Sequence, residues 1–280
     1  SFLRAIGWGA FTVVGLAGAS CGGGGGGGGD PAFVPNFLAA DVRVDAPPVN
    51  ELRRASDGRL VCKLEEADIT ELQARGWKAP EAFVAKGRDG KTDIWGVICR
   101  PADFVPGRKY PIVMFVHGAG YLQNVSDRYP NYFREQMFHN LLVQQGYVVL
   151  DMDYRASEGY GRDWRTAIYR QMGHPELEDY LDGVDYMVAN HQGDRANVGM
   201  YGGSYGGFMS FMALFRAPEV FKAGAALRPV TDWTTYNHEY TANILNTPDV
   251  DPEAYKKSSP IEYAQNLKGA LLISHGMMDD

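Results

Sequence analysis

The sequence predicts an α/β fold in which a mostly parallel sheet is covered by helices on both faces. From about residue 91 onward, short apolar runs alternate with segments of helical spacing. The apolar runs, such as residues 112–116 and 147–150, show no polar alternation, as expected for strands buried on both faces. One further run, at 198–201, leads directly into a glycine-rich turn and a helix. Together these observations favour a doubly covered parallel sheet over a bundle or a sandwich.

The elements follow one another in a regular order. Residues 31–90 carry short strand and turn patterns, with a helical pattern over 65–76. The amphipathic spacing is clearest where Leu177, Tyr180, Leu181, Val184 and Met187 recur on one helical face. The remaining predicted elements are strands at 94–99, 112–116, 147–150, 198–201, 223–227 and 270–274, and helices at 132–145 and 204–215. This alternation is typical of strands joined by crossover helices.

The composition fits an ordinary globular chain and excludes several classes of protein. Its 280 residues include 27 basic and 34 acidic side chains, a net charge of −7, so it lacks the basic excess that phosphate backbones require. No uncharged stretch reaches the roughly 20 consecutive apolar residues of a spanning helix. The three cysteines are too few for a disulfide framework and have no metal-ligand spacing. We predict no nucleic-acid partner, no cofactor and no metal.

The first thirty residues have the pattern of an export signal. Arg4 precedes sixteen uncharged, mostly apolar or small residues, then Cys21 and eight glycines. This order predicts a signal peptide at 1–20 and a flexible linker at 21–30. Residues 16–21 resemble the lipobox of bacterial lipoproteins, with Cys21 as the lipidated residue, although 17–19 also suit ordinary signal peptidase. We expect an exported protein in the periplasm or cell envelope, anchored by lipid or secreted.

The rest of the chain divides into two predicted parts. Residues 31–90 form a short β-rich segment, and residues 91–280 form the α/β domain. Because the chain starts without methionine and stops directly after a strand pattern, we expect it to be a fragment.

Ser204 is the predicted nucleophile. The run Gly202-Gly203-Ser204-Tyr205-Gly206 stands between a predicted strand and a predicted helix, the context of a nucleophile elbow. A serine on such a strained turn needs small residues two positions away on each side, and Gly202 and Gly206 meet this requirement. The following helix begins at the serine, where its N-terminus stabilises developing negative charge.

An acyl-transfer site also needs an oxyanion hole and an acid. The predicted oxyanion donors are the backbone N–H of Tyr205 and a group in the loop that begins His117-Gly118 after an earlier strand. For His117 we favour a role in shaping this loop over general-base work. The acid is expected at the tip of a later strand, where Asp279 fits and Asp280 is the adjacent competitor.

The general base is missing from the predicted set. None of the six histidines follows Asp279, and His275 is expected to lie inside the turn that ends its strand. We therefore expect the catalytic histidine beyond residue 280. Residues 1–280 alone are then expected to be poorly soluble and to hydrolyse peptide amides no faster than their own Ser204→Ala variant.

Several runs together carry a resemblance to a known family. They are residues 86–92, 153–157, 201–207, 229–243 and 275–280. Over roughly residues 52–280 the chain resembles the prolyl oligopeptidase family of serine peptidases, in particular its dipeptidyl peptidase IV-like branch. The resemblance implies an α/β-hydrolase catalytic domain that cleaves short peptides, often after proline or alanine. It implies peptide substrates, leaves a homodimer open, and makes residues 31–90 the remnant of a propeller-type domain.

The resemblance also implies roles for single residues. Ser204 matches the nucleophile, Tyr205 the oxyanion amide and Asp279 the acid. The substrate-binding positions that it implies are Val230, Trp233, Tyr236 and Tyr240. The last three also stand at spacings of 3, 4 and 7, which predicts one helical face lined by rings. The branch offers a tyrosine hydroxyl to the oxyanion where this chain has His117, so the second donor is left open.

Two alternatives remain beside a serine peptidase. The His-Gly loop and the short N-terminal segment are compatible with a carboxylesterase on the same fold. The second alternative is a non-catalytic binding protein that retains the fold.

Overall fold

The structure, a computed structural model, describes residues 36–41, 46–118, 121–126 and 133–279. The chain divides into two compact units, the first formed mainly by residues before Pro80. The signal segment expected at 1–20, the linker at 21–30 and the alternative acid Asp280 lie outside the described residues. Among the helices that are described, none is long and apolar enough to cross a membrane.

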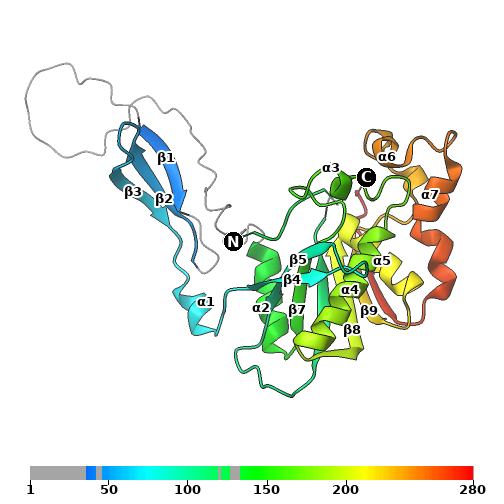
Figure 1. Cartoon of the computed structure of the whole chain (residues 1–280), viewed down its shortest axis with the longest axis horizontal. Helices are drawn as coiled ribbons and strands as arrows, with labels where there is room; N and C mark the ends of the chain where they lie inside the picture. Colours follow the sequence, from blue (N-terminus) through cyan, green and yellow to red (C-terminus); the bar gives the residue numbers. More distant parts are fainter. Residues whose placement is uncertain (1–35, 42–45, 119–120, 127–132, 280) are drawn as a thin grey trace, which may run out of the picture. The chain divides into compact units, whose positions relative to one another are not determined.

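The first unit contains a three-stranded antiparallel sheet and a short helix (Figure 1). Its elements are β1 (Asn36–Asp41), β2 (Val49–Arg54), β3 (Leu60–Glu66) and α1 (Thr70–Ala74). The β2–β3 reversal closes with a hydrogen bond from the Arg54 N–H to the Arg59 carbonyl, and Gly58 takes a φ of 71°. The helix is shorter than the pattern over 65–76 suggests, because residues up to Glu66 are paired with β2.

The second unit is built on a seven-stranded sheet with the order β10-β9-β8-β6-β7-β5-β4. Its strands are β4 (Glu81–Lys86), β5 (Asp93–Cys99), β6 (Tyr110–Val116), β7 (Val148–Asp153), β8 (Gly193–Gly203), β9 (Phe221–Leu227) and β10 (Ala270–Ser274). The strands β7, β6, β8, β9 and β10 pair in parallel, whereas β5 pairs antiparallel with both β4 and β7. This confirms the predicted, mostly parallel sheet.

The boundary between the two units differs from the expected one. The sequence pattern suggests that the α/β domain starts near residue 91, but β4 already belongs to its sheet. The reason is that β4 pairs with β5 along its whole length, from Glu81 opposite Ile98 to Lys86 opposite Asp93. The second unit accordingly begins at Pro80.

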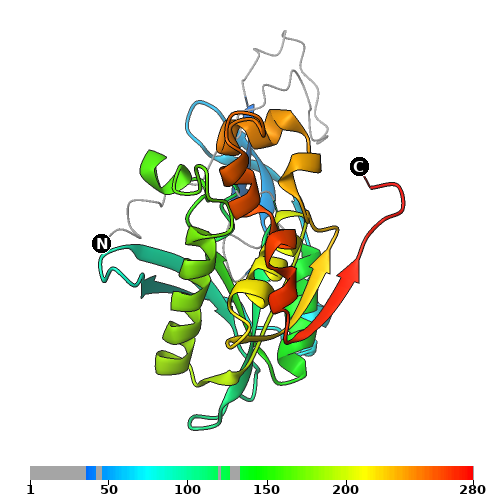
Figure 2. The same cartoon turned by 90° about the vertical axis from the view of Figure 1, so that its right-hand side faces the viewer.

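Helices cover both faces of the seven-stranded sheet (Figures 1 and 2). The helices of this unit are α2 (Phe133–Gln144), α3 (Arg162–Arg165), α4 (Pro175–Asn190), α5 (Tyr205–Arg216), α6 (His238–Leu245) and α7 (Pro252–Ser258), with the 3-10 helices η1 (Trp233–Thr235) and η2 (Pro260–Asn266). On one face α4 packs beside α5, and Gly183 of α4 lies against the Met152 side chain of β7. On the other face His139 of α2 contacts Phe115 of β6 edge to face.

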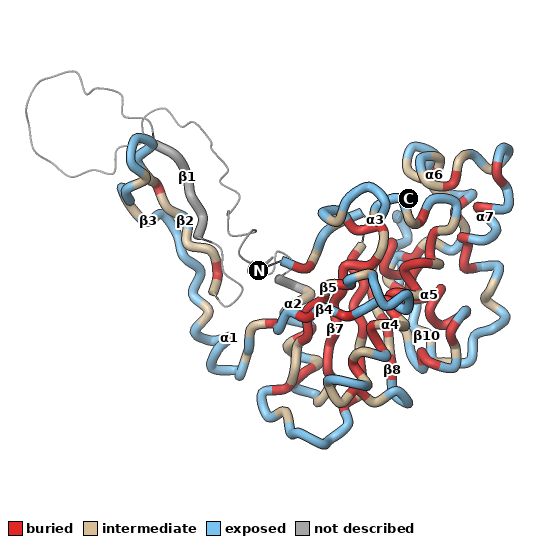
Figure 3. The backbone as a smooth tube through the Cα atoms, in the orientation of Figure 1, coloured by how far each residue is buried: buried red, intermediate tan, exposed pale blue. Residues whose placement is uncertain are grey.

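The core of this unit lies between the sheet and its helices. Figure 3 shows the central strands as buried, and every residue of β7 is buried. Helix α5 is also buried from Tyr205 to Phe215, so it is enclosed on nearly all sides. The element that follows Ser204 is therefore one of the most rigidly packed parts of the unit.

Candidate active site

Ser204 occupies a sharp turn between β8 and α5. Its backbone has φ 57° and ψ −115°, outside the regions that residues with side chains usually adopt. The Ser204 N–H donates to the carbonyl oxygen of Leu227 in β9 at 2.9 Å. Such strain persists only where the surroundings hold it in place, and it is frequent at functional sites. The predicted elbow is thus present in the backbone geometry.

Glycines on both sides of Ser204 make this turn possible. A Cβ atom on Gly202 would lie 2.8 Å from the Gly206 Cα, and a Cβ on either glycine would overlap the carbonyl oxygen of Val116. A Cβ on Gly207 would lie 2.8 Å from the Leu227 carbonyl oxygen. The requirement for small residues was predicted from the motif. The structure shows that the backbone of the neighbouring strand β6 imposes it.

The expected oxyanion donors meet at this turn. Tyr205 is the first residue of α5, so the helix provides no acceptor for its backbone N–H. Gly118, two residues after the end of β6, lies directly against the elbow: a Cβ atom there would be 3.2 Å from the Gly203 carbonyl oxygen. The two predicted halves of the oxyanion hole, from β6 and from α5, therefore adjoin each other.

His117 is buried beside the elbow, with 1% of its surface exposed. Its ring stacks on Tyr154 at 4.7 Å, Nδ1 lies 3.1 Å from the Gly118 carbonyl oxygen, and Nε2 lies 3.8 Å from an Asp153 carboxylate oxygen. Burial lowers the pKa of His117 to about 4, so its imidazole is neutral at physiological pH. The buried environment of His117 favours a role in shaping the loop over a role as general base.

Asp279 lies at the same edge of the sheet as Ser204. Ser204 follows β8 and Asp279 follows β10, and both strands run parallel to β9 between them. The carboxyl ends of parallel strands meet at one edge, where sites of such folds are found. One Asp279 carboxylate oxygen lies 3.6 Å from Nδ1 of His275.

All six histidines lie in the described part of the chain, and none of them hydrogen-bonds to Ser204 there. His139 is buried between Phe115 and Tyr201, and His191 lies against Tyr186. His174 contacts the Lys257 carbonyl oxygen, and His275 contacts that of Gly276. His238 is the first residue of α6. Within the described residues, the general base is not in place.

Three aromatic rings gather beyond the elbow, although not on one helix. The centroids of Trp233, Tyr236 and Tyr240 lie 5.6–6.0 Å apart. The predicted single helical face is wrong: η1 ends at Thr235, Tyr236 is extended, and α6 starts at His238. The break arises because the Asn237 side chain accepts a hydrogen bond from the Tyr240 N–H and caps a new helix.

The members of this aromatic cluster differ in their exposure. Trp233 is 1% exposed, contacts Tyr205 and Phe208, and donates from Nε1 to the Ser258 carbonyl oxygen. Trp233 therefore supports the cluster from the core. Tyr236, Tyr240 and Val230 are only partly buried and are available to line a pocket.

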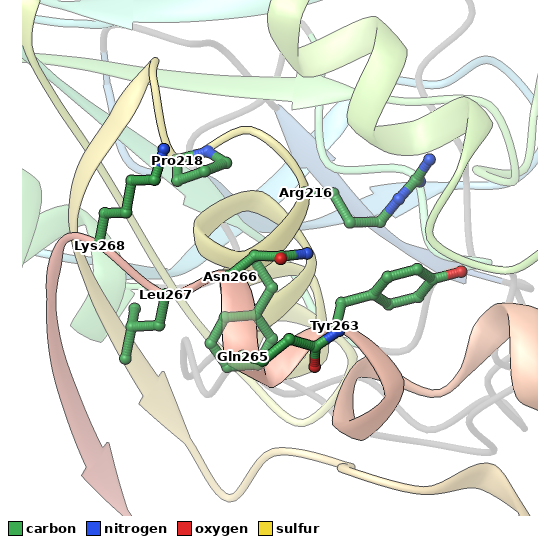
Figure 4. A pocket seen from close by; sticks show the side chains of 8 residues that line it. Arg216, Pro218, Tyr263, Gln265, Asn266, Leu267 and Lys268 are labelled. Carbon is green, nitrogen blue, oxygen red and sulfur yellow. The ribbon is translucent and has the colours of Figure 1, made fainter.

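Two of the cavities in the described part of this unit are relevant to the site. One of about 350 Å³ borders the aromatic cluster; its lining includes Tyr121, Arg165, Glu239, Tyr240 and Asn243. The other, of about 450 Å³, lies between the end of α5 and η2, where the Arg216 guanidinium stands over the Tyr263 ring (Figure 4). Since Ser204 precedes α5 and Arg216 ends it, about 18 Å away along the axis, only the first cavity adjoins the predicted site.

Sequence reasoning missed a group of buried carboxylates near the elbow. Asp153 ends β7 and accepts hydrogen bonds from the Asn124 and Val125 N–H groups and from Tyr160, while burial raises its pKa to about 6. Glu176, in the first turn of α4, is fully buried and contacts Tyr205. Acidic residues within an otherwise apolar strand or directly after a helix-starting proline are the signal that could have indicated them.

The sheet, its helices and the elbow define an α/β-hydrolase fold, and comparison with known proteins agrees. The family model described as "Prolyl oligopeptidase family" matches residues 133–280. Human (Homo sapiens) dipeptidyl peptidase 8 is 33% identical over 229 residues, which are 78% of this chain and 25% of that protein. The chain belongs to the prolyl oligopeptidase family.

Solved structures show the same similarity. A putative dipeptidyl aminopeptidase IV from Bacteroides ovatus has a TM-score of 0.75 and 30% identity, over 87% of this chain and 33% of that one. Dipeptidyl peptidase 4 from Porphyromonas gingivalis has a TM-score of 0.76 and 29% identity, over 88% of this chain and 36% of that one. The chain thus spans about a quarter to a third of the length of these relatives.

Proposed function

We propose that the protein is a serine peptidase that releases short peptides, in the manner of a dipeptidyl peptidase, through an acyl-enzyme on Ser204. The observation that carries the proposal is the strained Ser204 turn at the carboxyl edge of the sheet, beside two adjoining oxyanion segments. Ser204 Oγ attacks the scissile carbonyl carbon as a base takes its proton, and that proton then passes to the departing amine. Water hydrolyses the ester in a second round of the same steps.

Groups at the carboxyl edge of the sheet stabilise the charges that develop during this reaction. The Tyr205 N–H and a donor from the Gly118 loop hold the oxyanion of the tetrahedral intermediate. Asp279 orients the imidazole of the general base. In the described part of the chain no histidine hydrogen-bonds to Ser204, so the proposal names no residue as the base.

The aromatic cluster suggests the preferred substrate. Tyr236 and Tyr240 stand edge to face at 5.7 Å, and Trp233 supports both rings from the core. A flat, compact proline ring packs well against such rings. We therefore propose peptides with proline or alanine before the scissile bond as substrates.

A substrate panel tests this function. The full-length protein is assayed on aminoacyl-proline and aminoacyl-alanine amides, on matched amides with bulky or charged residues, and on short-chain nitrophenyl esters. We expect the highest kcat/KM on the proline amides. Faster turnover of the simple esters with no amide cleavage would instead identify a carboxylesterase. Failure of Ser204 to react with a fluorophosphonate probe would indicate a non-catalytic protein with this fold.

We also propose that the protein is exported and anchored by lipid at Cys21. Its proposed partners are peptide substrates and a second copy of the chain. The support is the sequence order of Arg4, an apolar run and Cys21, followed by glycines. In a bacterial host, the protein expressed with a start codon should fractionate with the cell envelope, cut next to Cys21. A Cys21→Ala variant should lose the lipid. Intact wild-type protein in the cytoplasm would contradict the proposal.

A further inference from the structure

Glu176 is a buried carboxyl group that contacts Tyr205, the residue directly after Ser204. It stands in the first turn of α4, after Pro175, and is completely buried. Its Oε1 atom accepts two hydrogen bonds, one from the Gly173 N–H at 3.0 Å and one from the phenol of Tyr205. Its Oε2 atom is buried and has no hydrogen-bond partner among the described residues. Burying a carboxyl group with one oxygen unpaired costs folding free energy, so this group does not contribute to stability alone.

The partner of Glu176 is the residue whose backbone is expected to hold the oxyanion. The Tyr205 side chain is 2% exposed, and burial raises the pKa of its phenol well above the ordinary value, so the phenol remains a donor. Because Tyr205 is the first residue of α5, the direction of its backbone N–H depends on the orientation of the first turn of this helix. The hydrogen bond to Glu176 ties that turn to α4.

Tyr205 also connects the two sides of the site. Its ring lies parallel to that of Tyr154 at 6.3 Å, and Tyr154 stacks in turn on His117 at 4.7 Å. On its other side Tyr205 contacts Trp233, which supports the aromatic cluster. The Glu176–Tyr205 hydrogen bond therefore holds one member of a continuous series of ring contacts. This series joins the oxyanion loop to the candidate substrate pocket.

We propose that Glu176 is a positioning residue, which fixes the Tyr205 side chain and thereby keeps the Tyr205 backbone N–H directed at the oxyanion. The inference rests on the proposed function, because it gives Glu176 a part in the reaction of Ser204. A small displacement of one oxyanion donor weakens binding of the transition state more than binding of the substrate, because the negative charge develops only in the transition state. Loss of the Glu176–Tyr205 bond should thus lower kcat and leave KM nearly unchanged.

The surroundings of Glu176 indicate which substitution preserves its role. Burial, with Asp179 nearby, raises the pKa of Glu176 to about 7. The other titratable groups that interact with it are the phenols of Tyr154, Tyr180, Tyr205 and Tyr240. Arg155, which follows Tyr154, is paired with Asp179. At pH 6 the carboxyl group is largely neutral, so glutamine reproduces its shape, charge and acceptor oxygen. Leucine reproduces only its volume.

The test compares five variants of the full-length protein at pH 6: Glu176→Gln, Glu176→Leu, Tyr205→Phe, the double variant E176L/Y205F and the control Tyr180→Phe. Tyr180 is a fully buried tyrosine of α4 whose phenol donates to the Phe115 carbonyl oxygen, so its substitution also removes one buried phenolic hydrogen bond. For each variant, kcat and KM on the preferred amide, the rate of Ser204 labelling by a fluorophosphonate and Tm are measured.

We expect E176L and Y205F each to lower kcat and the labelling rate about 10- to 100-fold, with KM within threefold of wild type. The double variant should lose no more than either single one, because both remove the same bond. E176Q should retain activity within about threefold, and Y180F within twofold even where its Tm falls. Equal losses of kcat in Y180F and Y205F, or full activity in E176L, would overturn the inference. Wild-type protein that fails to label at Ser204 would instead refute the proposed function.

Discussion

Replacing Ser204 with alanine is expected to lower kcat/KM on proline amides roughly 10⁴- to 10⁶-fold, the loss typical of removing a triad nucleophile. The reason is that no acyl-enzyme can form without the hydroxyl group. The fold should be retained, since Ser204 holds its turn through its backbone N–H, which donates to the Leu227 carbonyl oxygen in either variant. Active-site titration with a fluorophosphonate and steady-state kinetics on the full-length protein measure both effects.

A matched control is available on the same helix. Ser210 is a buried serine of α5 whose hydroxyl donates to the Gly206 carbonyl oxygen at 2.9 Å. Its replacement by alanine removes that bond and should change kcat/KM by no more than about threefold. Residual amide hydrolysis in Ser204→Ala close to the wild-type rate would show that another residue is the nucleophile.

Replacing Gly206 with alanine is expected to lower the free energy of unfolding by about 3 kcal/mol or more. Helix propensity alone favours alanine over glycine by about 1 kcal/mol. The added Cβ atom, however, would overlap the carbonyl oxygen of Val116 and come within 3.1 Å of its carbonyl carbon. Both belong to a buried backbone in the middle of the sheet, which cannot move aside as a flexible side chain can. The steric term therefore exceeds the propensity term.

Thermal and urea unfolding of the full-length protein measure this effect. For a domain of this size, 3 kcal/mol corresponds to a fall in Tm of about 6–12 °C. Gly199→Ala is the control, because Gly199 lies in β8 on the same approach to Ser204 and a Cβ there would be 3.4 Å from the Ala223 carbonyl oxygen, an ordinary contact. Its stability should change by less than about 1 kcal/mol. Similar losses from both substitutions would contradict the steric explanation.

Much of the fold could be predicted because its signals are local. The apolar runs at 112–116, 147–150 and 198–201 fall within β6, β7 and β8, and the periodic residues 177–187 fall within α4. The strand β4 was not predicted, since its short alternating segment is defined by pairing with β5 rather than by its own pattern. Strand pairing is a non-local property, and neighbouring residues carry little information about it.

The candidate site likewise contains features that the sequence predicted correctly and features that it did not. The elbow at Ser204 was predictable because its requirements, two glycines and a strand-to-helix transition, are written within a few residues. The aromatic cluster was predicted from helical spacing that does not exist, since Asn237 caps a new helix between Tyr236 and Tyr240. The rings nevertheless meet, because Trp233 is anchored in the core by Phe208 and Ser258.

The sequence by itself therefore determined the mostly parallel α/β architecture, the strained turn at Ser204 and the family. Each depends on short runs whose periodicity or glycine content limits the backbone locally. Only the tertiary structure decided that the Val116 backbone imposes the elbow glycines, that burial keeps His117 neutral, and that the Tyr205 phenol donates to Glu176. These facts depend on which segments are brought together from distant parts of the chain. Burial and contact, which set pKa values and steric limits, exist only once those segments have packed.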